Sequence, residues 1–195
     1  MLRAARDLSP PGSLRPQTYF ALIGLLACTG MRLGEALRLN VEDVDLQART
    51  IAVRQSKLHE VRMLPLHSST VKQLVRYDRQ RHASFPEAKA FFVSLRGTGL
   101  QAVTVEDTFR SLVAGVRCRG SRPRPRLTDL RHTFSCRVLL KWSRSQQNLD
   151  HHLLFLMHYL GHSKIRHTYW YLTAVPELFM QAAASFQSHS PLRSL

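Results

Sequence analysis

The apolar positions near the start of the chain predict two consecutive helices. Residues 17–29 are apolar almost all round, which is typical of a buried helix, and Gly30 follows at a position where helices often end. Residues 33–39 predict a second, shorter helix. Arg32 therefore falls at the junction between two helical segments.

A β-hairpin is predicted next. Residues 50–54 alternate between apolar and polar side chains, as a half-buried strand does, and residues 61–65 are its expected antiparallel partner. The polar residues 55–60 between them, which include Lys57, predict the connecting loop. We expect residues 91–94 to add a third strand.

Helical features dominate the rest of the chain. The expected helices cover residues 69–82, 104–118, 129–142, 148–160, 165–172 and 177–186. Thr104 with Asp107, and Asp129, are the expected N-terminal caps, and Gly161 is the expected stop of the helix before it. The sequence therefore predicts a mainly α protein with a small antiparallel β-sheet, an α+β fold.

Two segments are too rich in turn formers for regular structure. Residues 1–16 contain Ser9-Pro10-Pro11-Gly12-Ser13, so we expect them to remain unpacked, as a flexible lead or the remnant of a linker. Alternate prolines exclude a helix over residues 122–126 and predict an exposed cationic loop. We expect one domain over residues 17–187 and a tail over residues 188–195.

Composition narrows the class of protein. With 44% apolar residues and no apolar run near the length of about 20 residues that spans a membrane, the chain is typical of a soluble globular protein. Three separated cysteines, Cys28, Cys118 and Cys136, fit neither a disulfide framework nor a zinc site, which favours a reducing cytoplasm.

Charge points to a polyanionic partner. Lysine and arginine number 28 against 13 acidic residues, a formal net charge of +15. Such a surplus attracts nucleic acid through counterion release, although a basic but otherwise ordinary soluble surface is the alternative.

Several residues carry candidate chemistry, each with a plainer alternative. Arg32 and Glu35 are three apart on a helical face, so the carboxylate would orient a phosphate-binding guanidinium, unless they are an ordinary surface ion pair. Arg131 is expected in the first turn of a helix, where backbone amides favour an anion, or it is one of two surface cations of a capped helix. Lys57 is either a proton donor near bound DNA or a solvated loop lysine.

The histidines and aromatic residues near the C-terminus are ambiguous. His158 and His162 have the spacing of a metal site, but the motif lacks a glutamate and Gly161 interrupts the helix, so no zinc is expected. Tyr169, Trp170 and Tyr171 alone would suggest a buried aromatic anchor.

Taken together and in this order, these segments resemble the tyrosine recombinase, or phage integrase, family. The resemblance rests on Arg-Leu-Gly-Glu-Ala-Leu around Arg32, on Ser56-Lys57 followed by Arg62 and Leu64-Pro65-Leu66, on Asp-Leu-Arg-His-Thr-Phe around Arg131, and on Leu160-Gly161-His162 followed by Tyr171. It spans residues 17–184, nearly the whole chain, and implies the fold of the family's catalytic domain.

The resemblance also implies a mechanism. Tyr171 would be the nucleophile, since Tyr169 lies two residues too early, and Arg32 and Arg131 would hold the scissile phosphate. His162 would donate a further hydrogen bond and Lys57 would protonate the leaving 5′ oxygen. The product would be a 3′-phosphotyrosine, formed without a cofactor or metal.

The chain departs from the family pattern in two respects. The family usually carries a histidine three residues before the second arginine, where this chain has Thr128, which cannot act as a base near neutral pH. The family's N-terminal core-binding domain, which closes around duplex DNA, is expected to be absent because the chain starts too late to contain it.

The expected partners are double-stranded DNA and three further copies of the chain, a homo-tetramer on paired sites. The candidates for contacts with the DNA backbone are Arg122, Arg124, Arg126, Lys164 and Arg166. Two other classes of function remain open: an impaired or truncated recombinase that acts as a DNA-binding protein, and a type IB topoisomerase-like enzyme.

Overall fold

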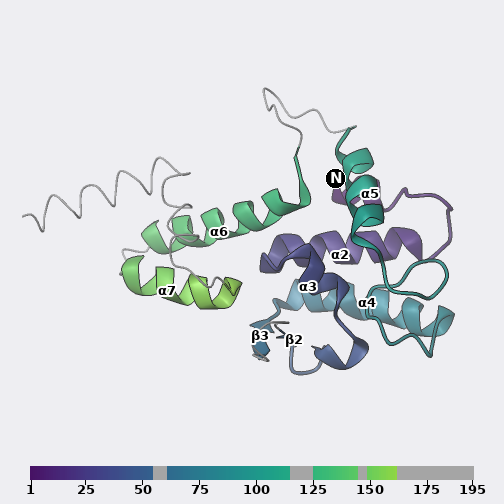
Figure 1. Ribbon diagram of the computed structural model, residues 1–195, viewed down its shortest axis with the longest axis horizontal. Helices are drawn as coiled ribbons and strands as arrows, with labels where there is room; N and C mark the ends of the chain where they lie inside the picture. The colour runs from purple at the N-terminus through teal and green to yellow at the C-terminus, as the bar shows by residue number, and fades with distance from the viewer. Residues whose placement is uncertain (55–60, 115–124, 145–148, 162–195) are drawn as a thin grey trace, which may run out of the picture. The chain divides into compact units, whose positions relative to one another are not determined.

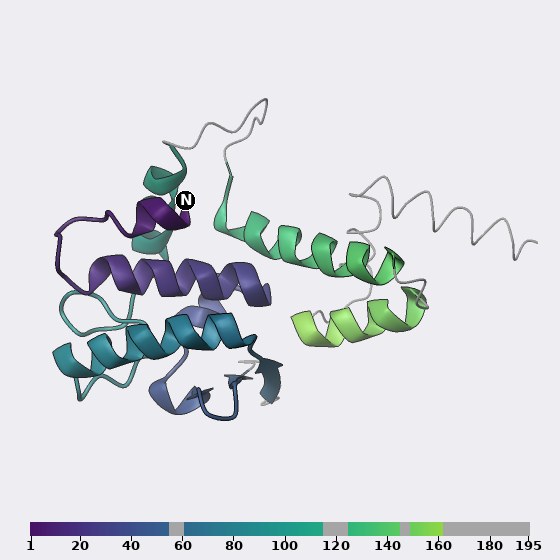
Figure 2. The same ribbon diagram turned by 180° about the vertical axis from the view of Figure 1, so that it is seen from behind.

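The computed structural model describes residues 1–54, 61–114, 125–144 and 149–161 of the 195-residue chain (Figures 1 and 2). The chain forms two compact units, Met1–Arg131 and His132–Leu195.

Helices supply most of the first unit. They are α1 (Leu2–Ala5), α2 (Arg15–Thr29), α3 (Leu33–Leu37), the 3-10 turn η1 (Val41–Asp43), α4 (Ser68–Ser84) and α5 (Ala102–Ala114). The all-round apolar pattern of α2 is explained by its position, because Leu22, Ile23 and Leu25 are fully buried. Helices α2 and α4 lie side by side in both views and form the centre of the unit (Figures 1 and 2).

The predicted hairpin is confirmed. Strand β2 (Thr50–Arg54) pairs antiparallel with β3 (Val61–Pro65), and Ile51 faces Leu64 while Val53 faces Arg62. Ile51, Val53 and Leu64 are buried, as the alternation requires. The loop with Lys57, residues 55–60, lies outside the described residues.

The third strand is not the predicted one. Strand β1 (Val44–Asp45) completes a sheet of order β1-β2-β3, whereas residues 91–94 make only the isolated bridge between Val93 and Gly99. Phe91 and Phe92 are both almost fully buried, so the segment does not alternate as a two-faced strand does. The Tyr77 hydroxyl of α4 holds it instead, donating to the Phe91 carbonyl (2.9 Å) and accepting from the Val93 amide (3.1 Å).

The two residues expected to be N-caps, Thr104 and Asp129, instead lie inside the first turn of their helices. Helix α5 begins at Ala102, so Thr104 lies inside it, where its carbonyl accepts from the Thr108 hydroxyl. Helix α6 (Leu127–Arg144) begins two residues before Asp129, whose carboxylate accepts from the Arg126 amide at 2.7 Å. Asp129 thus caps from inside the first turn, the reciprocal half of a capping box.

Part of the N-terminal segment packs, contrary to expectation. Helix α1 lies within residues 1–16, and Ala5 and Leu14 are buried. The Arg6 guanidinium stands 4.4 Å above the centre of the Phe20 ring on α2. The turn formers Pro10 and Gly12 occupy the connection between α1 and α2, so they redirect the chain without preventing its packing.

The second unit, which begins at His132 within α6, is described through the rest of that helix and through α7 (Leu149–Leu160). Leu139, Leu153, Leu156 and Leu160 form its buried cluster, and the rings of Phe134 and Tyr159 stack beside it with centres 5.7 Å apart. Gly161, with φ of 64°, follows α7 as predicted. The expected helices over residues 165–172 and 177–186 lie outside the described residues.

The predicted fold class is confirmed: the chain is mainly helical with a small three-stranded antiparallel sheet. None of the helices in the described ranges is both long and apolar enough to cross a membrane.

The two hydrogen bonds of the Tyr77 hydroxyl lead to a prediction about stability. Tyr77→Phe should lower the free energy of unfolding by about 2 kcal/mol, because a buried carbonyl and a buried amide lose their partner. Burial raises the pKa of Tyr77 to about 12, so the hydroxyl remains a donor at any working pH. Urea unfolding would measure the loss. The matched control is Tyr19→Phe, since the Thr108 hydroxyl that faces Tyr19 also reaches the Thr104 carbonyl. Equal losses of unfolding free energy in the two variants would contradict this role of the Tyr77 hydroxyl.

Candidate active site

A sharp turn between α2 and α3 sets the position of Arg32. Gly30 ends α2 in the left-handed conformation, with φ of 64° and its amide bound to the Leu26 carbonyl. Arg32 then takes an extended conformation and is the N-cap residue of α3. Because an L side chain is strained at positive φ, glycine suits the first of these positions.

Glu35 fixes Arg32 through two contacts. Its Oε2 accepts from the Arg32 backbone amide at 2.8 Å, and its Oε1 accepts from Arg32 Nη1 at 3.0 Å. The pairing expected from the spacing is therefore present, and it is no ordinary surface pair, because the Glu35 side chain is only 7% exposed. The Arg32 side chain is 47% exposed, so a ligand in solvent can reach it.

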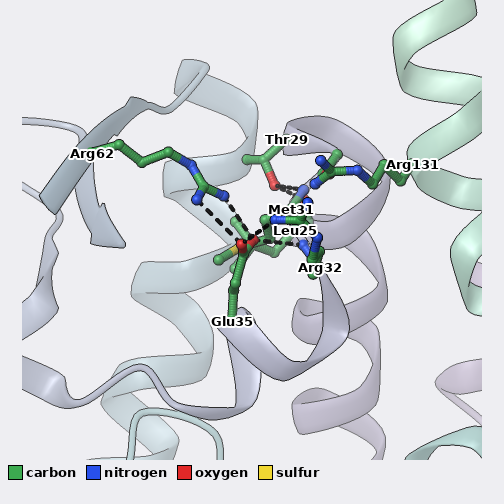
Figure 3. A network of polar contacts seen from close by, with 8 residues as sticks. Leu25, Thr29, Met31, Arg32, Glu35, Arg62 and Arg131 are labelled. Carbon is green, nitrogen blue, oxygen red and sulfur yellow. Dashed lines mark hydrogen bonds and ion pairs between the residues drawn. The ribbon is translucent and has the colours of Figure 1, made fainter. Parts of the chain in front are cut away.

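Arg62 is the partner whose role sequence reasoning missed. From β3 it binds Glu35 with both terminal nitrogens, Nη1 to Oε1 at 3.2 Å and Nη2 to Oε2 at 2.7 Å (Figure 3). Its side chain is 11% exposed. The sequence carried one signal: Arg62 lies two residues before Leu64 and therefore on the same inward face of the strand. A cation that is buried there needs a buried anion beside it.

The two arginines decide the ionisation of Glu35. Burial alone would raise the pKa of its carboxyl, but hydrogen bonds from Arg62 and from the Arg32 amide, with the Arg62 charge, outweigh burial and lower the pKa below its usual value. Glu35 is therefore an anion at neutral pH, placed between two cations.

Arg131 reaches the same turn from α6. Its side chain is buried, and Nη1 donates to the Gly30 carbonyl at 2.9 Å. Figure 3 shows its guanidinium beside the end of α2, close to Thr29. Since α6 begins at Leu127, Arg131 lies in the second helical turn, and the expected support from first-turn amides is wrong. At this position the guanidinium of Arg131, rather than the amides of the first helical turn, is the group that can bind an anion.

Arg32 and Arg131 are thus brought together at residues 30–32, although they lie far apart in sequence. The contact with Gly30 holds Arg131 through a neutral carbonyl, while Glu35 holds Arg32 through a carboxylate that Arg62 shares. Guanidinium groups present several N–H donors in one plane and bind phosphate oxygens well. This arrangement suits a phosphate diester.

The remaining candidates fall into two groups, those that the structure describes and those outside the described residues. Thr128 is exposed in the first turn of α6, and Arg126 just before that helix has a 71% exposed side chain. The candidates outside the described residues are Lys57, Arg122, Arg124, His162, Lys164, Arg166 and Tyr171. In the described part of the chain, no cluster of three histidine, cysteine or acidic side chains could hold a metal ion.

Comparison with known proteins shows the family of the chain. Residues 10–177 match the model of the phage integrase family, and the chain belongs to that family. The integrase/recombinase homologue y4rB of Sinorhizobium fredii is 38% identical over 174 residues, which cover 87% of this chain and 55% of the relative. Tyrosine recombinase XerC of Bacillus subtilis is 30% identical over 195 residues, which cover 95% of this chain and 57% of XerC. The chain thus spans little more than half the length of these relatives.

Solved structures support the fold. The XerA recombinase matches with a TM-score of 0.71 and 27% identity over 97% of this chain and 60% of that one. The XerH recombinase bound to its palindromic difH substrate matches with a TM-score of 0.71 at 20% identity, over 95% of this chain and 50% of that one. The second likeness concerns the fold alone.

The lowered pKa of Glu35 makes a prediction about acid stability. Because the folded pKa lies below the unfolded one, Glu35 stabilises the fold above the unfolded pKa, and this stability is lost as pH falls through the folded pKa. The free energy of unfolding of Glu35→Gln should therefore vary less between pH 5 and pH 3, by up to about 1.4 kcal/mol per pH unit. Urea titrations of both proteins at several pH values would measure it. Parallel pH profiles would contradict the assignment.

Proposed function

We propose that this chain is the catalytic part of a site-specific DNA recombinase or integrase that cleaves and rejoins DNA through a 3′-phosphotyrosine. The observation that carries the proposal is the meeting of Arg32 and Arg131 at one turn, each fixed by a different contact. Two guanidiniums on one phosphate offset the charge that gathers on its oxygens in the transition state. Membership of the phage integrase family supports the same reaction.

The proposed step conserves every atom and charge. The phenolic oxygen of Tyr171 attacks the phosphorus and releases its proton to water, and the bond from phosphorus to the 5′ oxygen breaks. Lys57 gives a proton to that oxygen, and His162 donates a hydrogen bond to a non-bridging oxygen. The ester to Tyr171 retains the energy of the broken bond, so rejoining needs no nucleotide.

The proposed partners follow from charge and from relatives. A net charge of +15 favours a polyanion, and the XerH structures contain DNA substrates. A lambda integrase dimer has been solved on a core DNA site. We propose that this chain acts in the cytoplasm as one protomer of a tetramer on paired sites, with the segment after Pro176 docking on a neighbouring protomer.

Thr128 motivates a second candidate function. A threonine hydroxyl cannot accept the phenolic proton near neutral pH, which costs a rate factor of order a hundred or more where a base normally assists. A chain slowed in this way would still bind DNA through its basic surface. The alternative is therefore a DNA-binding protein of recombinase ancestry.

An adduct assay tests the main proposal. A library of nicked duplexes with a randomised centre is incubated with the protein, and SDS-resistant complexes are captured and sequenced to define a cleavable site. On that site the wild type should form an adduct, and Tyr171→Phe should form none because the nucleophile is absent. Thr128→His should form it faster, by about tenfold or more, since a base is restored.

The outcomes separate the two functions. Tyr169→Phe is the matched control and should react like the wild type. An adduct that survives Tyr171→Phe would refute the nucleophile assignment. Binding of the library without any adduct, even for Thr128→His, would favour the DNA-binding protein.

The candidate backbone contacts make a separate prediction. Replacing Arg122, Arg124 and Arg126 together by glutamine should weaken binding to any duplex and reduce the slope of log affinity against log salt by about 0.9 for each phosphate that is no longer neutralised. Fluorescence anisotropy over a range of salt concentrations would measure it. Arg110→Gln is the control, because Arg110 is an exposed arginine paired with Asp107 on α5. An unchanged slope in the triple variant would exclude these three arginines as phosphate ligands.

A further inference from the structure

Glu35 is bound unequally by its two arginines. Arg62 donates to it from both terminal guanidinium nitrogens, at 3.2 and 2.7 Å, whereas Arg32 contributes a single guanidinium nitrogen at 3.0 Å. The exposed fractions differ in the same sense, 11% for Arg62 and 47% for Arg32. Arg62 is thus the main counter-ion of Glu35.

This inequality matters for the charge of the site. A carboxylate that is 7% exposed needs a cationic partner, because a buried unpaired charge is very costly. If Arg62 were missing, the cation left beside Glu35 among the described residues would be Arg32. The Glu35 carboxylate would then form a full ion pair with Arg32 and cancel the positive potential that attracts a phosphate.

We propose that Arg62 is a positioning residue for strand cleavage, which engages Glu35 so that this carboxylate orients Arg32 without neutralising it. The inference rests on the proposed function, because it concerns the arginine assigned to the scissile phosphate. Arg62 itself lies on β3 and acts through Glu35, not on the DNA.

The proposal predicts that Arg62→Met slows adduct formation and that adding Glu35→Gln restores part of the rate. At saturating protein on the captured site, Arg62→Met should form the adduct about 10- to 100-fold more slowly than the wild type, somewhat less than the direct loss of a transition-state donor. Glu35→Gln added to Arg62→Met removes the competing charge, so the double variant should react at least about threefold faster than Arg62→Met. A purely structural role for Arg62 predicts a double variant as slow as the single one, or slower.

A modified DNA identifies the step affected. With sulfur in place of the bridging 5′ oxygen, the leaving group is a thiolate, which departs without a proton because a thiol is far more acidic than an alcohol. Lys57→Ala should be rescued by this substrate, since Lys57 supplies only that proton. Arg62→Met should remain slow, because its defect lies in the charge on the non-bridging oxygens. Rescue of Arg62→Met by sulfur would overturn the proposal in favour of an effect on Lys57.

Controls separate this idea from the failure of folding and of the function itself. Arg54→Met is the matched variant, because Arg54 lies on β2 and pairs with Asp43 at 2.8 Å but not with Glu35. It should react at the wild-type rate. If circular dichroism shows that Arg62→Met does not fold, Arg62→Gln, which loses the charge but keeps a hydrogen-bond donor, takes its place with and without Glu35→Gln. A wild type that forms no adduct refutes the proposed function, whereas a reactive wild type with an unrescued double variant refutes only the role of Arg62.

Discussion

The site depends on one buried carboxylate. Glu35 lies under the α2–α3 turn with almost no exposure, and a charge in that position is tolerated only with cations around it. It therefore ties three parts of the first unit together: the backbone at Arg32, the Arg32 side chain, and strand β3 through Arg62. The hairpin of β2 and β3 and the turn after α2 cannot move independently without breaking this pairing.

The scaffold around the turn keeps that geometry stiff. Helix α2 is packed on most of its surface and lies beside α4, which in turn holds the Phe91–Val93 segment through Tyr77. A closely packed interior resists small displacements, so a turn at the end of a buried helix is a fixed platform. Catalysis by electrostatic preorganisation needs such a platform, because donors that must reorganise lose much of their effect.

The two phosphate-binding candidates are held by contrasting means. Arg131 is buried and bound to a neutral carbonyl of the turn, while Arg32 is half-exposed and bound to a carboxylate shared with Arg62. The proposed function gives this pair its chemical role, and Thr128, exposed one turn before Arg131, is where we expect the chain to depart from the family pattern. The same fold is therefore compatible with a full recombinase and with a slower one.

Local patterns in the sequence predicted most of the described helices, the hairpin and the pairing of Arg32 with Glu35, since periodicity, a stop at Gly30 and short spacings are properties of neighbouring residues. They failed at residues 91–94, where Tyr77 supplies the partner of an apolar segment, and at the start of α6, which moved Arg131 out of the first turn. Only the tertiary structure decided that Arg62 faces Glu35 and that Arg131 meets Gly30, 101 positions away. The physical reason is that counter-ions and carbonyl partners are chosen by burial and proximity in space, and no local spacing records either.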